Sequence, residues 1–541
     1  MMTLSTKLVR KVGLSMLAPM LFVIVPSCTS LTETPHDALT PNNAFKTDEE
    51  ILAGVAGVYA QLRPVEWVGY ITLEDLTTDV AIVPTRGSDW YDNGQWLDLH
   101  RQTYTPNSSG TLAFVDGAWS DMFSGVAKAN LMIDVITKSQ LSQARKDSAL
   151  AELRTLRAWD YYMLNDMFGG VPLVSTTELK QYPRDTRDNV FKFIESELLA
   201  ARANLPNKWD ASGYGRMTKG AANAILASLY INAAVLDKDA GVSATGYNSC
   251  SGVTVTGGSA CAAAISAADA VINSGTYSLN TVWKNNFSLD NKGSPENIFV
   301  IVHSKDQALG GSWPLRTLHY NQLNTGWGSP WNGFATIAET YNAFDAADER
   351  KAMWLQGQAY SFETGQPVND RTGKPLIFTA TIADANAASE GEGVRFNKFP
   401  PLPSASSGNG MPNDFTFFRL AEMYLIKAEA LNEQGQTAAA LVELNRIHNL
   451  HDAANPITAS TQTQIRDAIL KERLLEFAAE GKRRTDMIRH GKFTTWTESI
   501  KNGVCGASGT CGPARAAFRI LFPIPATQLG SNPLLTQNAG Y

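Results

Sequence analysis

The sequence is poor in cysteine, histidine and charge. Its 541 residues include 5 cysteines and 7 histidines, and 18% of the residues are charged. Lys and Arg number 46 against 52 Asp and Glu, a formal net charge of -6, so no nucleic-acid partner is expected, because such partners need a basic surface. Walker loops, GxGxxG, HExxH and nucleophile-elbow motifs are missing, which leaves nucleotide enzymes, that class of zinc protease and elbow-type serine hydrolases without support. We expect no cofactor.

The chain is rich in apolar and aromatic residues. Apolar residues make up 44% of the sequence, and there are 12 Trp and 16 Tyr. This composition is typical of a globular protein and excludes wholesale disorder. The aromatic surplus is the first pointer to function.

One apolar run stands at the N-terminus. It covers Val12–Val25, which is too short for a bilayer span of about 20 residues. Lys7, Arg10 and Lys11 precede the run and Pro26-Ser27-Cys28 follows it, so residues 1–27 are predicted to be a signal peptide. Because Cys28 follows a small residue, we predict that it is lipidated and that the mature chain is anchored to a membrane by lipid alone. Ordinary cleavage nearby is the alternative.

The other four cysteines form two close pairs. Cys250 with Cys261, and Cys505 with Cys511, each enclose a short loop rich in Gly, Ser and Thr. In an exported chain such pairs predict two local disulfides. Metal binding is the competing interpretation, but neither spacing is of the CxxC type and no histidine is close. We therefore predict no metal site.

A second group of metal-type residues lies near the C-terminal end. His448, His451 and Asp452 form an HxxHD sequence at the end of an expected helix. Cations are favourable at a helix C-terminus without any metal, so we favour a structural role.

Helical periodicity dominates both ends of the chain. Residues 28–43 are polar, contain two prolines and are predicted to be a tether. Helices are expected over 48–62, 115–136, 144–168, 189–205, 218–236, 262–272, 417–434, 437–449, 463–479 and 483–489. Residues 275–415 and 70–107 are rich in loop-forming residues, so loops and short strands are expected there.

The segment from Arg419 to Ile447 looks like a tetratricopeptide unit. Ala428 and Ala430 are small enough for close helix contact, and Gly435 can form the turn, although a strict 34-residue period is missing. The predicted fold is therefore mainly α, built of tetratricopeptide-like helical hairpins in a single compact unit with long irregular loops and a few short strands. Such hairpins can bind a partner on a concave surface or serve purely as scaffold.

Six motifs follow one another in the order found in one family. They are Leu31-Thr-Glu-Thr-Pro35 with Ala53–Tyr59, Arg154–Tyr162, Phe168–Leu173, Gly215–Gly220 with Ala224–Tyr230, Glu472–Arg489, and Pro523–Pro525 with Asn532-Pro533 and Gln537–Tyr541. Together they resemble the SusD/RagB family of outer-membrane nutrient-binding lipoproteins of Bacteroidetes, with Ala539 where proline is usual. The match covers nearly the whole chain.

The resemblance implies an organisation and a function. It implies a SusD-like unit over 44–541, with an N-terminal part at 44–240 and a C-terminal part at 241–541 that contains the loop-rich insertion 275–415. It also implies a non-catalytic lipoprotein of the outer membrane, facing outward, that captures oligosaccharide and passes it to a SusC-like TonB-dependent transporter. The motif residues are expected to be structural; Arg483 and Asp486, for example, are spaced to pair across one helical turn.

Glycan capture needs flat aromatic faces and polar groups around them. The two irregular stretches have this composition, and the candidate glycan-binding residues are Asp79, Arg86, Trp90 and Trp96 in the first and Tyr320, Trp327 and Trp331 in the second. Trp119 and Trp159 lie in helical patterns and are expected in the core. An aromatic in a loop can equally cover the core.

Two alternatives of another class stay open. A peptide-binding or protein-binding helical-repeat lipoprotein would share the fold. A glycoside hydrolase with a carboxylate pair such as Asp79 and Asp89 would need a fixed separation and one raised pKa, which sequence does not reveal.

Overall fold

The computed structural model describes residues 45–305, 309–323, 329–405, 408–506 and 515–541. Contacts divide the chain into Met1–Lys46 and a compact unit, Thr47–Tyr541. The predicted signal peptide, Cys28 and the tether lie outside the described residues. Within the described ranges, no helix is both long and apolar enough to span a membrane.

Long antiparallel helices form the first part of the compact unit. The first, α1 (Asp48–Tyr59), begins with a capping box in which the side chains of Thr47 and Glu50 each bind the other's backbone N–H, a device worth about 1 kcal/mol. The helices that follow are α2 (Leu62–Val65), α4 (Asp116–Lys138), α5 (Gln143–Phe168), α6 (Arg187–Ala201), α7 (Lys219–Ile231) and α8 (Ala233–Leu236). As predicted, α5 ends at Gly169, whose φ of 75° favours glycine.

The stretch 70–107 is more regular than predicted. It contains most of the π-helix η1 (Glu66–Asp75), the short 3-10 turn η2 (Asp92–Gly94) and the helix α3 (Gln95–His100). Burial explains the difference for η1, because Tyr70, Ile71 and Leu73 all lie in the core. Tertiary packing has overridden a weak local pattern.

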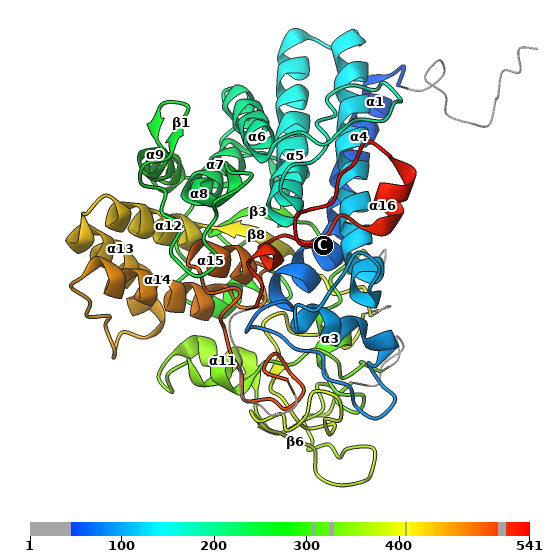
Figure 1. Cartoon of the computed structure of the whole chain (residues 1–541), viewed down its shortest axis with the longest axis vertical. Helices are drawn as coiled ribbons and strands as arrows, with labels where there is room; N and C mark the ends of the chain where they lie inside the picture. Colours follow the sequence, from blue (N-terminus) through cyan, green and yellow to red (C-terminus); the bar gives the residue numbers. More distant parts are fainter. Residues whose placement is uncertain (1–44, 306–308, 324–328, 406–407, 507–514) are drawn as a thin grey trace, which may run out of the picture. The chain divides into compact units, whose positions relative to one another are not determined.

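The predicted tetratricopeptide-like hairpin is confirmed. It consists of α12 (Leu420–Glu433) and α13 (Thr437–His451), joined at Gly435 with a φ of 78°. Leu425, Ala428 and Leu444 are fully buried in the cluster that joins them. Figure 1 shows this pair between α9 (Ala260–Ile272) and α14 (Gln462–Phe477), followed by α15 (Arg483–Arg489). The fold is mainly helical, as predicted.

A two-stranded sheet lies against the helices. Strand β3 (Asn297–Ile301) pairs antiparallel with β8 (Phe415–Arg419), so the helix expected from residue 417 in fact begins at Leu420. All five residues of β8 are buried, and Phe417 packs against Trp159 and Phe299. This packing favours the extended strand over a first turn of helix at residues 417–419. Trp159 and Trp119 are 0% and 5% exposed, so their predicted core positions are confirmed.

Short elements occupy the loop-rich insertion, as expected. They are α10 (Trp313–Thr317), α11 (Ala338–Asn342), and the paired strands β4 (Trp354–Leu355) with β7 (Arg395–Phe396) and β5 (Gly357–Gln358) with β6 (Ile377–Phe378). Outside the insertion lie β1 (Thr254–Val255) with β2 (Gly258–Ser259), and α16 (Ala526–Ser531).

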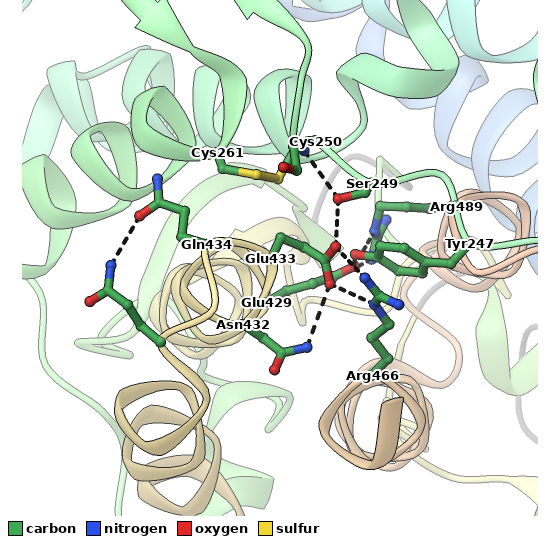
Figure 2. The surroundings of a disulfide bond; sticks show 12 residues. Tyr247, Ser249, Cys250, Cys261, Glu429, Asn432, Glu433, Gln434, Arg466 and Arg489 are labelled. Carbon is green, nitrogen blue, oxygen red and sulfur yellow. Dashed lines mark hydrogen bonds and ion pairs between the residues drawn. A yellow bond between two sulfur atoms is a disulfide. The ribbon is translucent and has the colours of Figure 1, made fainter. Parts of the chain in front are cut away.

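The structure contains the disulfide predicted between Cys250 and Cys261. Figure 2 shows it beside the end of α12, where Ser249 donates a hydrogen bond to Glu433 and Arg466 binds the same carboxylate at 2.7 Å through two nitrogens. Cys505 is also disulfide-bonded, and Cys511, its predicted partner, lies outside the described residues.

Buried ion pairs join the C-terminal helices to the N-terminal part. Arg483 on α15 binds both carboxylate oxygens of Asp79 at 2.7 Å, and Arg484 binds Asp166 at 2.6 Å. The predicted pairing of Arg483 with Asp486 is therefore wrong; the pair one helical turn apart is Asp486 with Arg489, at 2.9 Å. These arginines are needed because a buried carboxylate without a cation costs several kcal/mol.

The HxxHD residues take part in the same kind of network. His448 lies 2.7 Å from Glu472, and His451 lies 2.7 Å from Glu349. In the part of the chain that the structure describes, no group of His, Cys, Asp or Glu is arranged to hold a metal ion.

Candidate functional site

The structure brings the two aromatic stretches together. The indole Nε1 of Trp90 donates a hydrogen bond to the carbonyl oxygen of Trp331 at 2.6 Å, and the two ring centroids lie 6.2 Å apart. The hydroxyl of Tyr320 donates to Asp89 at 2.7 Å. Residues separated by more than 200 positions in sequence thus share one surface.

The ring of Trp90 is held firmly in place. Its backbone φ of 63° is unusual for a tryptophan and costs of the order of 1–3 kcal/mol, so the surroundings must enforce it. The ring covers the backbone of Gly333, where an added Cβ would lie 2.3 Å from Cζ2 of the indole. Trp96 and Phe334 meet its ring at edge-on angles. The platform is therefore preorganised before any ligand arrives.

The loops that carry these rings fold tightly for local reasons. Asn93 and Gly94, just after the aromatic pair Trp90-Tyr91, adopt φ values of 55° and 78°, which Asn and Gly tolerate better than other residues. On the second stretch Asn332 has a φ of 54°, and its side chain donates to the carbonyl oxygen of Glu390 at 3.1 Å.

Aromatic surface remains open to solvent around Trp90. Trp331 is 41% exposed and Tyr91 is 60% exposed, while Trp90 and Tyr320 are half-buried. Tyr91 is outside the predicted set, although its position beside Trp90 in an aromatic-rich stretch could have identified it.

A charged rim adjoins the rings. Arg371 binds Asp89 at 2.8 Å and also binds Glu390, and its guanidinium lies 4.3 Å from the centroid of the Tyr320 ring. His319 bonds to Glu390 at 2.9 Å. Neither Arg371 nor Glu390 was predicted, because Arg371 comes from the segment between β5 and β6 and reaches Asp89 across 282 residues.

The rim keeps its carboxylates ionised. The hydrogen bond from the Tyr320 hydroxyl, helped by Arg371, lowers the pKa of Asp89. Burial opposes ionisation of Glu390, but hydrogen bonds from Arg371 and His319 outweigh it and lower the pKa of that group too. Burial raises the pKa of Tyr320, and the neighbouring Asp89 raises it further, so its hydroxyl keeps its proton. The rim therefore offers fixed hydrogen-bonding groups at neutral pH.

Three of the predicted residues are supports rather than exposed faces. Trp96 is 4% exposed and donates to Asp92 at 2.7 Å, so its ring does not face solvent as expected. Arg86 is 2% exposed and donates to the carbonyl oxygens of Gly333 and Glu392, and burial lowers its pKa to about 10. Both oxygens of Asp79 are taken by Arg483. Trp327 lies outside the described residues.

The geometry gives no support to Asp79 and Asp89 as the carboxylate pair of a glycosidase. A retaining or inverting enzyme needs one carboxyl with a raised pKa as the proton donor. Asp89 has a lowered pKa, and Asp79 forms a two-point ion pair with Arg483. The arrangement is suited to holding a ligand.

Comparison with known proteins identifies the family. The model of the SusD family matches residues 282–541, and a second model, described as starch-binding associating with outer membrane, matches residues 38–231. The chain belongs to the SusD/RagB family, as its motifs predicted.

Relatives in sequence are distant but span nearly the whole chain. SusD-like protein P2 of Formosa agariphila is 23% identical over 96% of this chain and 98% of that protein. The starch-binding protein SusD of Bacteroides thetaiotaomicron is 24% identical over 84% of this chain and 82% of that protein.

Solved structures share the fold. A laminarin-binding SusD-like protein matches 92% of this chain and 100% of its own length, with a TM-score of 0.70 and 22% identity. Surface glycan-binding protein A from Bacteroides thetaiotaomicron, solved with laminarihexaose, matches 91% of this chain and 99% of its own, with a TM-score of 0.69 and 19% identity.

Proposed function

We propose that this protein binds an oligosaccharide or polysaccharide without altering it, using the surface formed by Trp90, Trp331 and Tyr320. The observation that carries the proposal is the rigid, partly exposed pair Trp90–Trp331 beside the ionised rim of Asp89 and Arg371. Sugar rings place their C–H faces on such aromatic surfaces, and their hydroxyl groups bond to carboxylates and guanidinium groups. Relatives named for starch, laminarin and surface glycans support this ligand class.

Each residue has a distinct part in this proposal. Trp90, Trp331 and the exposed Tyr91 supply ring faces, while Asp89 and Arg371 supply the acceptor and the donors. Arg86 and Trp96 hold the loops beneath, and Asp79 anchors the first stretch to α15. Trp327 remains a predicted contributor.

The cellular context is also proposed. The predicted lipid on Cys28 would hold the protein at the outer membrane, facing outward. A SusC-like TonB-dependent transporter is the expected partner, because a captured glycan held next to a transporter has a high effective concentration at its entrance. The family supports both points.

A glycan screen tests the proposal directly. The full chain, purified in detergent, is run in native gels containing laminarin, amylopectin, xylan or no polysaccharide. We expect retardation by at least one glycan, without release of reducing sugar. Trp331→Ala should weaken that binding about tenfold, because losing one stacked ring removes about 1.4 kcal/mol.

A matched control variant shows whether removing any surface aromatic residue weakens glycan binding. Tyr182→Ala removes a partly exposed tyrosine whose hydroxyl bonds locally to Thr176, far along the chain from the site. It should bind as the wild type does. Absence of any retardation, or equal binding by Trp331→Ala, would refute the proposal, and release of reducing sugar would restore the hydrolase alternative.

A further inference from the structure

A second groove lies on other elements of the compact unit. Its narrower part has a volume of about 460 Å³ and runs along α1, lined by Val55, Ala56 and Tyr59. Its wider part has a volume of about 960 Å³ and reaches Trp209 and Tyr277. The two parts adjoin each other, because both are lined by residues of the segment 212–216, by Val300 within β3 and by Val302 after it. None of the predicted glycan-binding residues that the structure describes lies in it.

The walls of this groove are preformed. Gly215 has a φ of 83°, and an added Cβ there would lie 2.2 Å from Cγ2 of Val302, so the segment packs closely against the residue that follows β3. Asp210 caps the turn η4 (Ala211–Gly213) through the backbone N–H groups of Ser212 and Gly213.

The buried carboxylate of Glu152 links the two walls of the groove. The hydroxyl of Tyr59 on α1 donates to Glu152 at 2.6 Å, and Arg216 from the opposite wall binds the same carboxylate. The backbone N–H of Met217 donates to the Tyr59 hydroxyl at 2.8 Å. A groove fixed in this way needs little reorganisation to accept a ligand.

The wider part presents aromatic rings whose polar atoms are already satisfied. Trp209 donates its Nε1 to the carbonyl oxygen of Met217 at 2.8 Å, and Tyr214 donates its hydroxyl to Asp414 at 2.8 Å. Tyr277 shares a hydrogen bond of 3.1 Å with Thr218. All three rings are half-buried. The platform at Trp90 has the same design, a partly exposed ring with its N–H bonded to the backbone.

The narrow part holds an arginine with donors to spare. Arg63 donates Nη2 to the carbonyl oxygen of Val302 at 3.1 Å, and its half-buried side chain lines the groove, whereas its unpaired Nε is buried away from the groove. A guanidinium in that position can donate to the oxygen atoms of a ligand in the groove.

A short path leads from Arg63 to the first site. Trp67 follows Arg63 by four residues, about one turn along the continuous helical segment of α2 and η1. The guanidinium of Arg316 lies 4.1 Å from the Trp67 ring centroid and 5.4 Å from that of Trp331. Trp67, one helical turn from Arg63, therefore shares the guanidinium of Arg316 with the exposed ring of Trp331.

We infer that this groove is a second saccharide-binding site, which holds further sugar units of the polysaccharide bound at Trp90 and Trp331. The inference rests on the proposed function and extends it to the length of the ligand. Aromatic walls and arginine donors favour a sugar chain over a purely apolar ligand. Joining two weak sites through one polymer raises the affinity for long chains without changing the affinity for short ones.

The test fills the groove and compares chain lengths. Ala56→Trp places a bulky ring at an exposed position that lines the narrow part, and Ala53→Trp adds the same ring at an exposed position of α1 outside the groove. Binding of the full chain is measured with laminarin and laminaritriose, and with amylopectin and maltotriose. We expect Ala56→Trp to weaken polymer binding about tenfold and to leave trisaccharide binding unchanged, while Ala53→Trp changes neither. Trp209→Ala, as a second variant, should act like Ala56→Trp.

The outcomes separate the two proposals. If polymer binding survives both Ala56→Trp and Trp209→Ala, the groove is not a saccharide-binding site, while the proposed function of the Trp90–Trp331 surface is unaffected. If Ala56→Trp leaves polymer binding intact but breaks copurification with an outer-membrane transporter, the groove is a protein-docking surface and the inference is wrong. If the wild type binds no glycan, the proposed function fails and this inference fails with it.

Discussion

The substitution Trp96→Ala should show whether the Trp96 ring stabilises the fold or binds glycan. A ring that binds glycan in solvent can be removed with little loss of stability, whereas a buried ring cannot. Trp96 is 4% exposed, and its ring centroid lies 4.8 Å from that of Phe114, 5.1 Å from Trp90 and 5.6 Å from Phe334. Trp96→Ala is therefore expected to destabilise the fold.

The magnitude follows from the buried surface. A tryptophan buries about 200 Å², which at about 25 cal/mol per Å² corresponds to roughly 5 kcal/mol, and measured losses for such truncations are about 3–5 kcal/mol. The hydrogen bond to Asp92 at 2.7 Å adds about 1 kcal/mol at most. We expect the free energy of unfolding to fall by about 3–5 kcal/mol. For Trp331→Ala, at 41% exposure, the same arithmetic covers about 120 Å² and gives a smaller loss, at most about 3 kcal/mol.

Urea unfolding followed by circular dichroism at 222 nm measures both losses without relying on tryptophan fluorescence. Trp96→Phe serves as the matched control, because it keeps an aromatic ring among the same neighbours and should recover most of the stability. A Trp96→Ala variant with wild-type stability and no glycan binding would refute the reasoning and make Trp96 part of the binding surface.

Three further predictions use other parts of the chain. Cys28→Ala should release the protein from the outer-membrane fraction; continued sedimentation with membranes would place the anchor elsewhere. Gly333→Ala should weaken glycan binding and lower the free energy of unfolding by about 1–3 kcal/mol, because the new Cβ would displace the Trp90 ring from 2.3 Å away; unaltered binding would show that the ring can move without losing its function. Because Tyr320 and Arg371 lower the pKa of Asp89, the ionised form persists below the ordinary value of about 3.9, and its contribution is lost only as the pH falls through the lower folded value. Glycan binding should therefore be constant between pH 7 and about pH 5, and a decline that Asp89→Asn also shows would assign it to another group.

Much of the fold could be predicted from the sequence because the helix, turn and stop signals in the sequence agree with the pattern of buried residues in the structure. The helix ending at Gly169, the turn at Gly435 and the family motifs each depend on residues close in sequence. The strand at Phe415–Arg419 was missed because its five buried residues are followed directly by a helix, and only the partner strand, more than a hundred residues earlier, distinguishes the two.

The site was predictable in composition but not in geometry. Aromatic content located both stretches, yet it could not separate Trp90 from Trp96, six residues later, because their exposure depends on Phe334 and Gly333. Arg371 carried no local signal, since it reaches the site only through the fold. Sequence patterns report which face of an element is apolar, and a loop has no such periodicity.

The ion pairs between Arg483 and Asp79 have a consequence for the order in which the molecule can fold. The two residues are 404 positions apart, and Arg484 binds Asp166 across 318 positions. During synthesis, Asp79 and Asp166 emerge from the ribosome long before Arg483 and Arg484, which lie in about the last tenth of the polypeptide. Contacts over such separations are slow to form. The ion pairs of Asp79 and Asp166 with α15 can therefore form only late, and a chain interrupted before α15 would lack the two arginines that bind these carboxylates.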